Sequence, residues 1–215
     1  MLISSIILTS IIYILELVFA FLEKETLRKV IKPFCMLSLT FVLISLNVTN
    51  YFLYIIIALG FLGDICLIYK KTNKIVFSIG IGLFFIGHIL YCYLFSKELN
   101  YDVQLWVYIG LGVFGLLTPL LTYKTLHPMA KEYTILGTYY FYILFMDLLF
   151  STFLMVNNTS INTILIFVGV LFFILSDSIL SFTTFIMDVK RRDFYIMLTY
   201  LIAQSLIAIN LAILL

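Results

Sequence analysis

The sequence predicts an all-α, polytopic integral membrane protein of about eight transmembrane helices, and three observations lead to this fold class. The 215 residues are 64% hydrophobic and 11% charged, whereas about a quarter of the residues of a soluble domain are charged. The apolar runs are about 20 residues long, the length that crosses a bilayer as a helix. They do not alternate as barrel strands do, and helices satisfy their own backbone hydrogen bonds in lipid. The composition excludes a soluble enzyme or a nucleic-acid-binding domain.

We expect a single transmembrane helical domain over residues 1–215, without a long linker or soluble domain. The first apolar stretch, Leu2 to Leu22, has no basic start and no small-residue cleavage site, so we interpret it as a retained span. A weak break at Val48-Thr49-Asn50 predicts a tight turn between the second and third spans. The predicted spans are 2–22, 33–49, 51–69, 75–95, 103–122, 133–155, 163–187 and 194–215.

The basic residues alternate between the connecting loops. Twelve of the 13 Lys and Arg residues fall in the first, third, fifth and seventh loops, and Lys97 alone falls in an even-numbered loop. The positive-inside rule therefore places the odd-numbered loops in the cytoplasm and both termini outside it. In a bacterium, the membrane would be the inner one. The odd-loop residues are Lys24, Arg28, Lys29, Lys32, Lys70, Lys71, Lys74, Lys124, Lys131, Lys190, Arg191 and Arg192.

Several polar side chains lie within the predicted spans. An ionisable residue costs a few kcal/mol at the centre of a membrane, so each is a candidate functional residue. At a rise of 1.5 Å per residue, most of them fall in the cytoplasmic half, which predicts a polar cavity opening toward that side. Glu16 lies near enough to the membrane surface to pair with Lys24 or Lys32. The polar set comprises Glu16, Asp64, His88, Asp147, Asp177, Tyr200 and Gln204.

Metal and cofactor chemistry receive little support from the sequence. The chain has two histidines, and His127 precedes Pro128 in a predicted loop. Catalytic zinc takes about three protein ligands, usually rich in histidine. The three cysteines lack ligand spacing and are interpreted as small buried hydrophobic residues. We therefore expect neither a metal nor another cofactor.

Two segments share a short pattern that suggests an internal repeat. Asp64 and Asp177 each follow a small residue and precede a leucine by three positions. Each is followed by a basic loop and then by a span with a polar residue, His88 in one case and Gln204 in the other. Our hypothesis is a 4+4 repeat whose halves are related by an axis along the membrane normal.

The order and spacing of these residues resemble the YhhN-like family of membrane proteins, which includes the lysoplasmalogenases. The resemblance covers nearly the whole chain. Asp147 is not part of the family pattern, and we interpret it as a packing or polar-lining residue. The resemblance is carried by Lys32-Pro33, by Leu62-Gly63-Asp64 with Leu67, by Gly82, Phe85, Gly87-His88 and Tyr91, by Gly169, Phe173, Ser176-Asp177 and Leu180, and by Thr199-Tyr200, Ala203-Gln204 and Ile207.

The resemblance implies an eight-helix fold and hydrolysis of the vinyl ether bond of lysoplasmalogens to a fatty aldehyde and a glycerophospho-base. The implied partners are a lysophospholipid substrate and membrane lipids, and no nucleic acid. Vinyl ether hydrolysis needs an acid that protonates carbon, a negative charge that stabilises the oxocarbenium ion, and a water molecule. Glycosidases solve a related problem with two carboxyl groups.

Asp64 and Asp177 are the residues that we expect to supply these two carboxyl groups, and the sequence does not assign the acid. His88 is expected to orient water or relay the proton. The expected substrate-binding residues are Lys32 for the phosphate, together with Tyr91, Ser176, Tyr200 and Gln204.

The sequence leaves two other function classes open. Intramembrane Asp and His residues also build proton relays, and a repeat suits alternating access, so a small proton-coupled transporter is one alternative. A non-catalytic lipid-binding membrane protein is another. Headgroup preference, chain preference and oligomeric state are not predicted.

Overall fold

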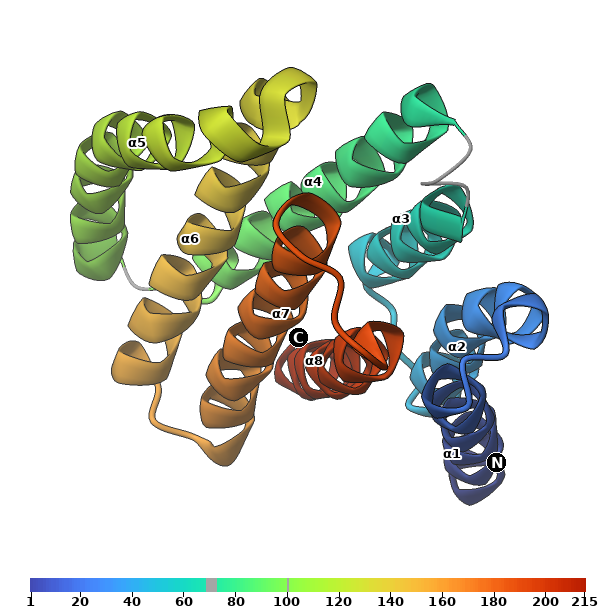
Figure 1. The fold of residues 1–215 in the computed structure, drawn as a ribbon. Helices are drawn as coiled ribbons and strands as arrows, with labels where there is room; N and C mark the ends of the chain where they lie inside the picture. The colour runs from blue at the N-terminus through green and yellow to red at the C-terminus, as the bar shows by residue number, and fades with distance from the viewer. Residues whose placement is uncertain (69–72, 100) are drawn as a thin grey trace.

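The computed structural model describes residues 1–68, 73–99 and 101–215, and in these ranges it is all-helical (Figure 1). Lys70 and Lys71, counted above among the basic loop residues, lie outside the described residues. The elements are α1 (Leu2–Phe21), α2 (Glu25–Ser45), α3 (Tyr51–Ile68), α4 (Lys74–Lys97), α5 (Tyr101–Ala130), the 3₁₀ turn η1 (Lys131–Tyr133), α6 (Thr134–Asn157), α7 (Ile161–Phe185) and α8 (Arg192–Leu214).

Six of these helices are long and apolar enough to cross a membrane: α1, α3, α4, α6, α7 and α8. The protein is therefore a multi-pass integral membrane protein. The helix α2 is not among the six, and it carries four charged residues near its start, Glu25, Arg28, Lys29 and Lys32. The count of eight spans and the 4+4 repeat stay predictions.

Short turns reverse the chain between neighbouring helices. Glu23, Asn47 and Arg191 adopt left-handed backbone conformations, with φ between 55° and 57°, at the α1–α2, α2–α3 and α7–α8 connections. The predicted break near residues 48–50 is confirmed, because α2 ends at Ser45 and α3 begins at Tyr51. At the start of α7, the Ser160 side chain accepts from the Thr163 backbone N–H and completes a capping box.

Two predicted boundaries differ from the structure. His127 lies inside α5, which continues to Ala130, and not in a loop. Arg28, Lys29 and Lys32 lie in the opening turns of α2 and not in the first loop. Hydropathy marks the part of a helix that fits lipid, whereas the helix itself extends past it with charged residues that reach the membrane surface.

Close helix packing brings the carboxylate-bearing helices against their successors. A Cβ on Gly63 would lie 2.7 Å from the Phe84 ring of α4, and a Cβ on Gly169 would lie 2.8 Å from Ile207 of α8. These glycines let α3 pack on α4 and α7 pack on α8. The helix α8 also contacts α1 and α2, while α4 contacts α6. Figure 1 shows α8 between α7 and the α1–α2 pair.

Candidate functional site

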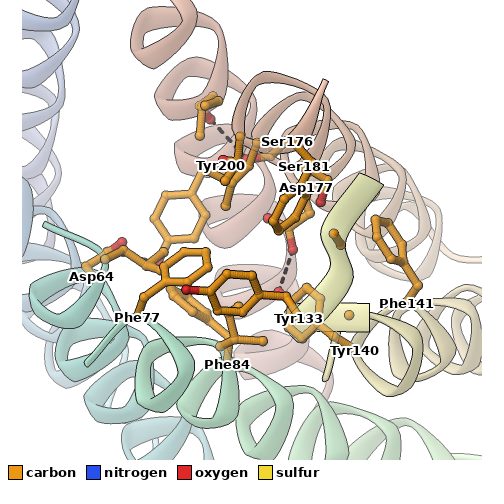
Figure 2. A pocket seen from close by; sticks show the side chains of 18 of the residues that line it. Asp64, Phe77, Phe84, Tyr133, Tyr140, Phe141, Ser176, Asp177, Ser181 and Tyr200 are labelled. Carbon is orange, nitrogen blue, oxygen red and sulfur yellow. Dashed lines mark hydrogen bonds between the residues drawn. The ribbon is translucent and has the colours of Figure 1, made fainter. Parts of the chain in front are cut away.

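An apolar cavity lies among α2, α3, α4, α6, α7 and α8, and Figure 2 shows the side chains around it. Aromatic rings form much of its wall, among them Phe77, Phe84, Tyr133 and Phe141. The structure brings five of the predicted site residues to this one cavity from four helices. They are Lys32, Asp64, Ser176, Asp177 and Tyr200.

Asp64 lies on the charged side of the cavity and has a partner at each carboxylate oxygen. The Lys32 ammonium of α2 lies 3.1 Å from Oδ1, and the Tyr200 hydroxyl of α8 donates to Oδ2 at 3.0 Å. The residue is 1% exposed. A buried carboxylate is tolerated where a cation and a hydrogen bond replace its water, and Asp64 has both of these partners.

Asp177 lies on the apolar side of the cavity and has a neutral partner. The Tyr140 hydroxyl of α6 donates to Oδ2 at 2.5 Å. Among the described residues, no Lys, Arg or His side chain forms an ion pair with Asp177. Figure 2 shows Asp64 and Asp177 apart from each other, with Tyr200 on the Asp64 side. The two carboxyl groups therefore face one cavity in two different electrostatic settings.

His88 does not line this cavity but belongs to a second buried polar group. Its Nδ1 pairs with Asp147 Oδ2, and the Cys92 thiol lies 3.0 Å from Asp147 Oδ1 as a donor. The imidazole edge packs on Phe173 with ring centroids 4.4 Å apart, and Tyr140 is the next ring at 5.9 Å. This group, His88–Asp147–Cys92, therefore lies beside Tyr140, whose hydroxyl bonds to Asp177.

Tyr91 and Gln204, both expected to bind substrate, bind each other instead. The Tyr91 hydroxyl donates to Gln204 Oε1 at 3.0 Å, in a buried contact between α4 and α8. Neither residue lines the cavity. Ser176 does line it, but its hydroxyl donates to the Ile196 carbonyl at 3.1 Å. These three polar groups join helices in the structure.

Glu16 has a different partner from the ones expected. Its carboxylate accepts from Arg28 Nε at 3.1 Å, and Arg28 Nη1 lies 2.6 Å from Asp193 Oδ2. The pairing links α1, α2 and α8 beside the Lys32–Asp64 pair. Spacing along the chain favoured Lys24 or Lys32, but Arg28 lies one helical turn before Lys32 on the same helix face.

Tyr140 was not predicted as a site residue, and Asp147 was predicted to be a packing or polar-lining residue. Tyr140 is one of 15 tyrosines and had no distinguishing signal. Asp147 was noticed as an intramembrane acid but was set aside because it lies outside the family pattern. Its burial at 2% exposure and its pairing with His88 make it part of the polar interior. The sequence signal for Asp147 was its place within a span, because a charged side chain there is costly unless it has a partner.

The described residues contain no cluster of three or more His, Cys, Asp or Glu side chains placed to hold a metal ion. The polar groups that line the cavity are carboxyl, phenol, ammonium and hydroxyl groups.

The fold and the cavity define a multi-pass helical membrane protein with carboxyl groups facing an apolar cavity. The YhhN family model matches residues 27–211. The chain belongs to the YhhN family. No curated protein and no solved structure matches the chain.

Proposed function

We propose that this protein hydrolyses the vinyl ether bond of a lysoplasmalogen and releases a fatty aldehyde and a glycerophospho-base. Membership of the YhhN family supports this class of reaction. The observation that carries the proposal is the pair of buried carboxyl groups, one beside a cation and one beside a phenol, on a cavity lined by apolar rings.

The different surroundings suggest different roles. Asp177 has no cationic partner among the described residues, so it is the carboxyl group that is suited to carry a proton and deliver it to the β-carbon of the vinyl ether. Asp64 stays a carboxylate beside Lys32 and stabilises the oxocarbenium ion that results.

The reaction then balances with one water molecule. Its oxygen bonds to the oxocarbenium carbon, and the proton that it loses returns to Asp177, directly or by way of Asp64, so that the acid is re-formed. The hemiacetal collapses as its hydroxyl loses a proton, the glycerol oxygen gains one and the carbon–oxygen bond to that oxygen breaks, which gives the aldehyde and a free glycerol hydroxyl. Tyr200 and Tyr140 fix the two carboxyl groups in position, and His88 supports the Asp177 side through Tyr140 and Phe173.

The membrane setting fits a lipid substrate. We propose that the basic ends of the helices face the cytoplasm and that both termini lie on the other side. Lys32 then lies on the cytoplasmic side of Asp64, where its ammonium contacts the substrate phosphate as well as the carboxylate. In a bacterial cell, this membrane is the inner one.

The test is aldehyde release by the purified protein from lysoplasmenyl-ethanolamine and lysoplasmenyl-choline. The matched controls are the alkyl ether and ester lysophospholipids of the same chain length, which contain no vinyl ether. We expect aldehyde from the vinyl ethers alone. A folded protein that releases none contradicts the proposal. In that case, proton-coupled solute flux in liposomes would indicate a transporter, and lipid binding without flux would indicate a lipid-binding protein.

A further inference from the structure

A second hollow adjoins the cavity at the starts of α2 and α8. It has a volume of about 290 Å³, well above the roughly 10–15 Å³ that holds one water molecule by the same measure. Five side chains line both spaces: Lys32, Leu67, Leu180, Ile196 and Met197. The two spaces therefore share a wall, and Lys32 is the charged side chain in that wall. We call the second space the basic cleft.

Four cations line the basic cleft, and three of them already have partners. Arg28 bonds to Glu16 and Asp193, and Lys32 bonds to Asp64. Arg192 pairs with Asp188 at 2.9 Å. Lys29 is exposed and forms no ion pair with any of the residues that the structure describes. Among the described residues of the cleft, Lys29 is thus a cation that is open to a ligand anion.

The two spaces together have the polarity of a single-chain amphiphile. The cleft presents four ammonium or guanidinium groups and the two carboxyl groups of Glu25 and Asp193, whereas the cavity behind Lys32 presents apolar rings and leucine side chains. A molecule that fills both needs an anionic end and an apolar chain. The three N–H donors of Lys32 allow it to keep its bond to Asp64 and to donate to an anion in the cleft.

We infer that the basic cleft is a subsite for the phosphodiester headgroup of a single-chain phospholipid, with Lys29 as the residue that selects for phosphate. Lys32 forms the boundary between headgroup and chain, and Arg192 lies beside the phosphate. The identity of the lipid as a vinyl ether rests on the proposed function, whereas the selection for phosphate does not.

The test measures binding to the purified full chain in lipid nanodiscs, with probes that contain no vinyl ether. Ester-linked lysophosphatidylethanolamine is compared with the monoacylglycerol of the same chain, which lacks the phosphate. We expect the phospholipid to bind roughly tenfold more tightly, as one charge-assisted hydrogen bond at a partly exposed site allows. We expect this preference to weaken as salt is added, because Lys29 is exposed.

The variant Lys29→Gln is expected to remove most of the preference, and Lys29→Arg is expected to restore it. Lys124→Gln is the control, since Lys124 is an exposed lysine of α5 that lines neither space. Equal binding of the two probes, or a preference that survives Lys29→Gln, overturns the inference. Displacement of the lipid by an equal concentration of glycerophosphoethanolamine also overturns it, because the cleft would then be a site for soluble phosphodiesters.

Because neither probe is cleaved by vinyl ether chemistry, this experiment fails or succeeds separately from the aldehyde assay. Phosphate-selective binding without aldehyde release would uphold the headgroup subsite and contradict the proposed reaction. Aldehyde release without phosphate selection would do the reverse.

Discussion

Asp64 and Asp177 face the same cavity, yet the groups that contact their carboxyl oxygens differ in charge. Asp64 contacts the Lys32 ammonium of α2 and the Tyr200 hydroxyl of α8. Asp177 accepts a hydrogen bond from the Tyr140 hydroxyl of α6. Each carboxyl group thus takes a partner from the helix that precedes its own, but the partner is charged in one case and neutral in the other. Two aspartates with the same sequence signature therefore have different electrostatic surroundings, and on this difference we base the proposal that one acts as an anion and the other as an acid.

The largest expected effect comes from removing either carboxyl group. Asp177→Asn removes the proposed acid and should lower aldehyde turnover by about 10²–10⁴-fold, the usual contribution of a positioned general acid. Asp64→Asn should produce a loss of similar order, because the oxocarbenium ion loses its counter-charge. Turnover by purified variants is the measurement, and the melting temperature is the check on folding. Near-normal turnover in either folded variant would remove that residue from the reaction.

A smaller loss is expected when the cation beside Asp64 is removed. Lys32→Met leaves a buried carboxylate without its cation and should cost roughly 3–5 kcal/mol of stability. Turnover should fall roughly 10- to 100-fold, since the electrostatic setting of Asp64 changes. Thermal unfolding and initial rates measure the two effects.

The exposed Lys74–Glu132 pair provides the matched control. Its side chains are 72% and 56% exposed, so Lys74→Met should leave both stability and turnover nearly unchanged. Equal behaviour of the two lysine variants would mean that burial of the Lys32–Asp64 pair has no consequence.

Changes to the buried His88–Asp147 pair should lower aldehyde turnover less than changes at Lys32 or the two cavity aspartates. Asp147→Asn keeps the shape of the side chain but removes the anion that His88 contacts. We expect roughly a tenfold loss of turnover, because His88 supports the rings beside Asp177. Glu132→Gln is the control for removing a carboxylate at an exposed position. If Asp147→Asn lowers the melting temperature and leaves the rate unchanged, the His88–Asp147 pair is a packing element only.

Tightening the α3–α4 contact should affect catalysis least, and its main effect should be on stability. A methyl group on Gly63 would lie 2.7 Å from the Phe84 ring, so Gly63→Ala must displace that ring and should cost about 1–3 kcal/mol. Gly82→Ala is the control on the next helix, because nothing lies within 4 Å of its added methyl group. It should be neutral or stabilising by up to about 1 kcal/mol. Thermal unfolding compares the two, and an equally stable Gly63→Ala would contradict the close approach.

The sequence predicted the helical membrane fold and five residues of the cavity wall, but it predicted a polar cavity, whereas apolar side chains form most of the wall. Apolar length and the cost of charge in lipid are properties of single segments, and they marked the helices and the polar residues within them. Lys32, Asp64, Ser176, Asp177 and Tyr200 were all expected at one site, and all line one cavity.

Pairing between helices was not predictable in the same way. Nothing in the sequence indicated that Tyr140 would bond to Asp177, that His88 would bond to Asp147, or that Tyr91 would bond to Gln204. These bonds depend on helix rotation and on which helices are neighbours in space, and both follow from packing of the whole bundle. The same limit explains why His88 was expected at the cavity and lies behind its wall.

The central claim, protonation of carbon by a carboxylic acid inside the membrane, is tested most directly by running the reaction in heavy water. A deuteron added to the β-carbon remains in the product, so the aldehyde should carry one deuterium on the carbon next to its carbonyl. The reaction should also be slower than in ordinary water, because transfer of that deuteron limits the rate. An aldehyde released at the full rate and without deuterium would contradict the account.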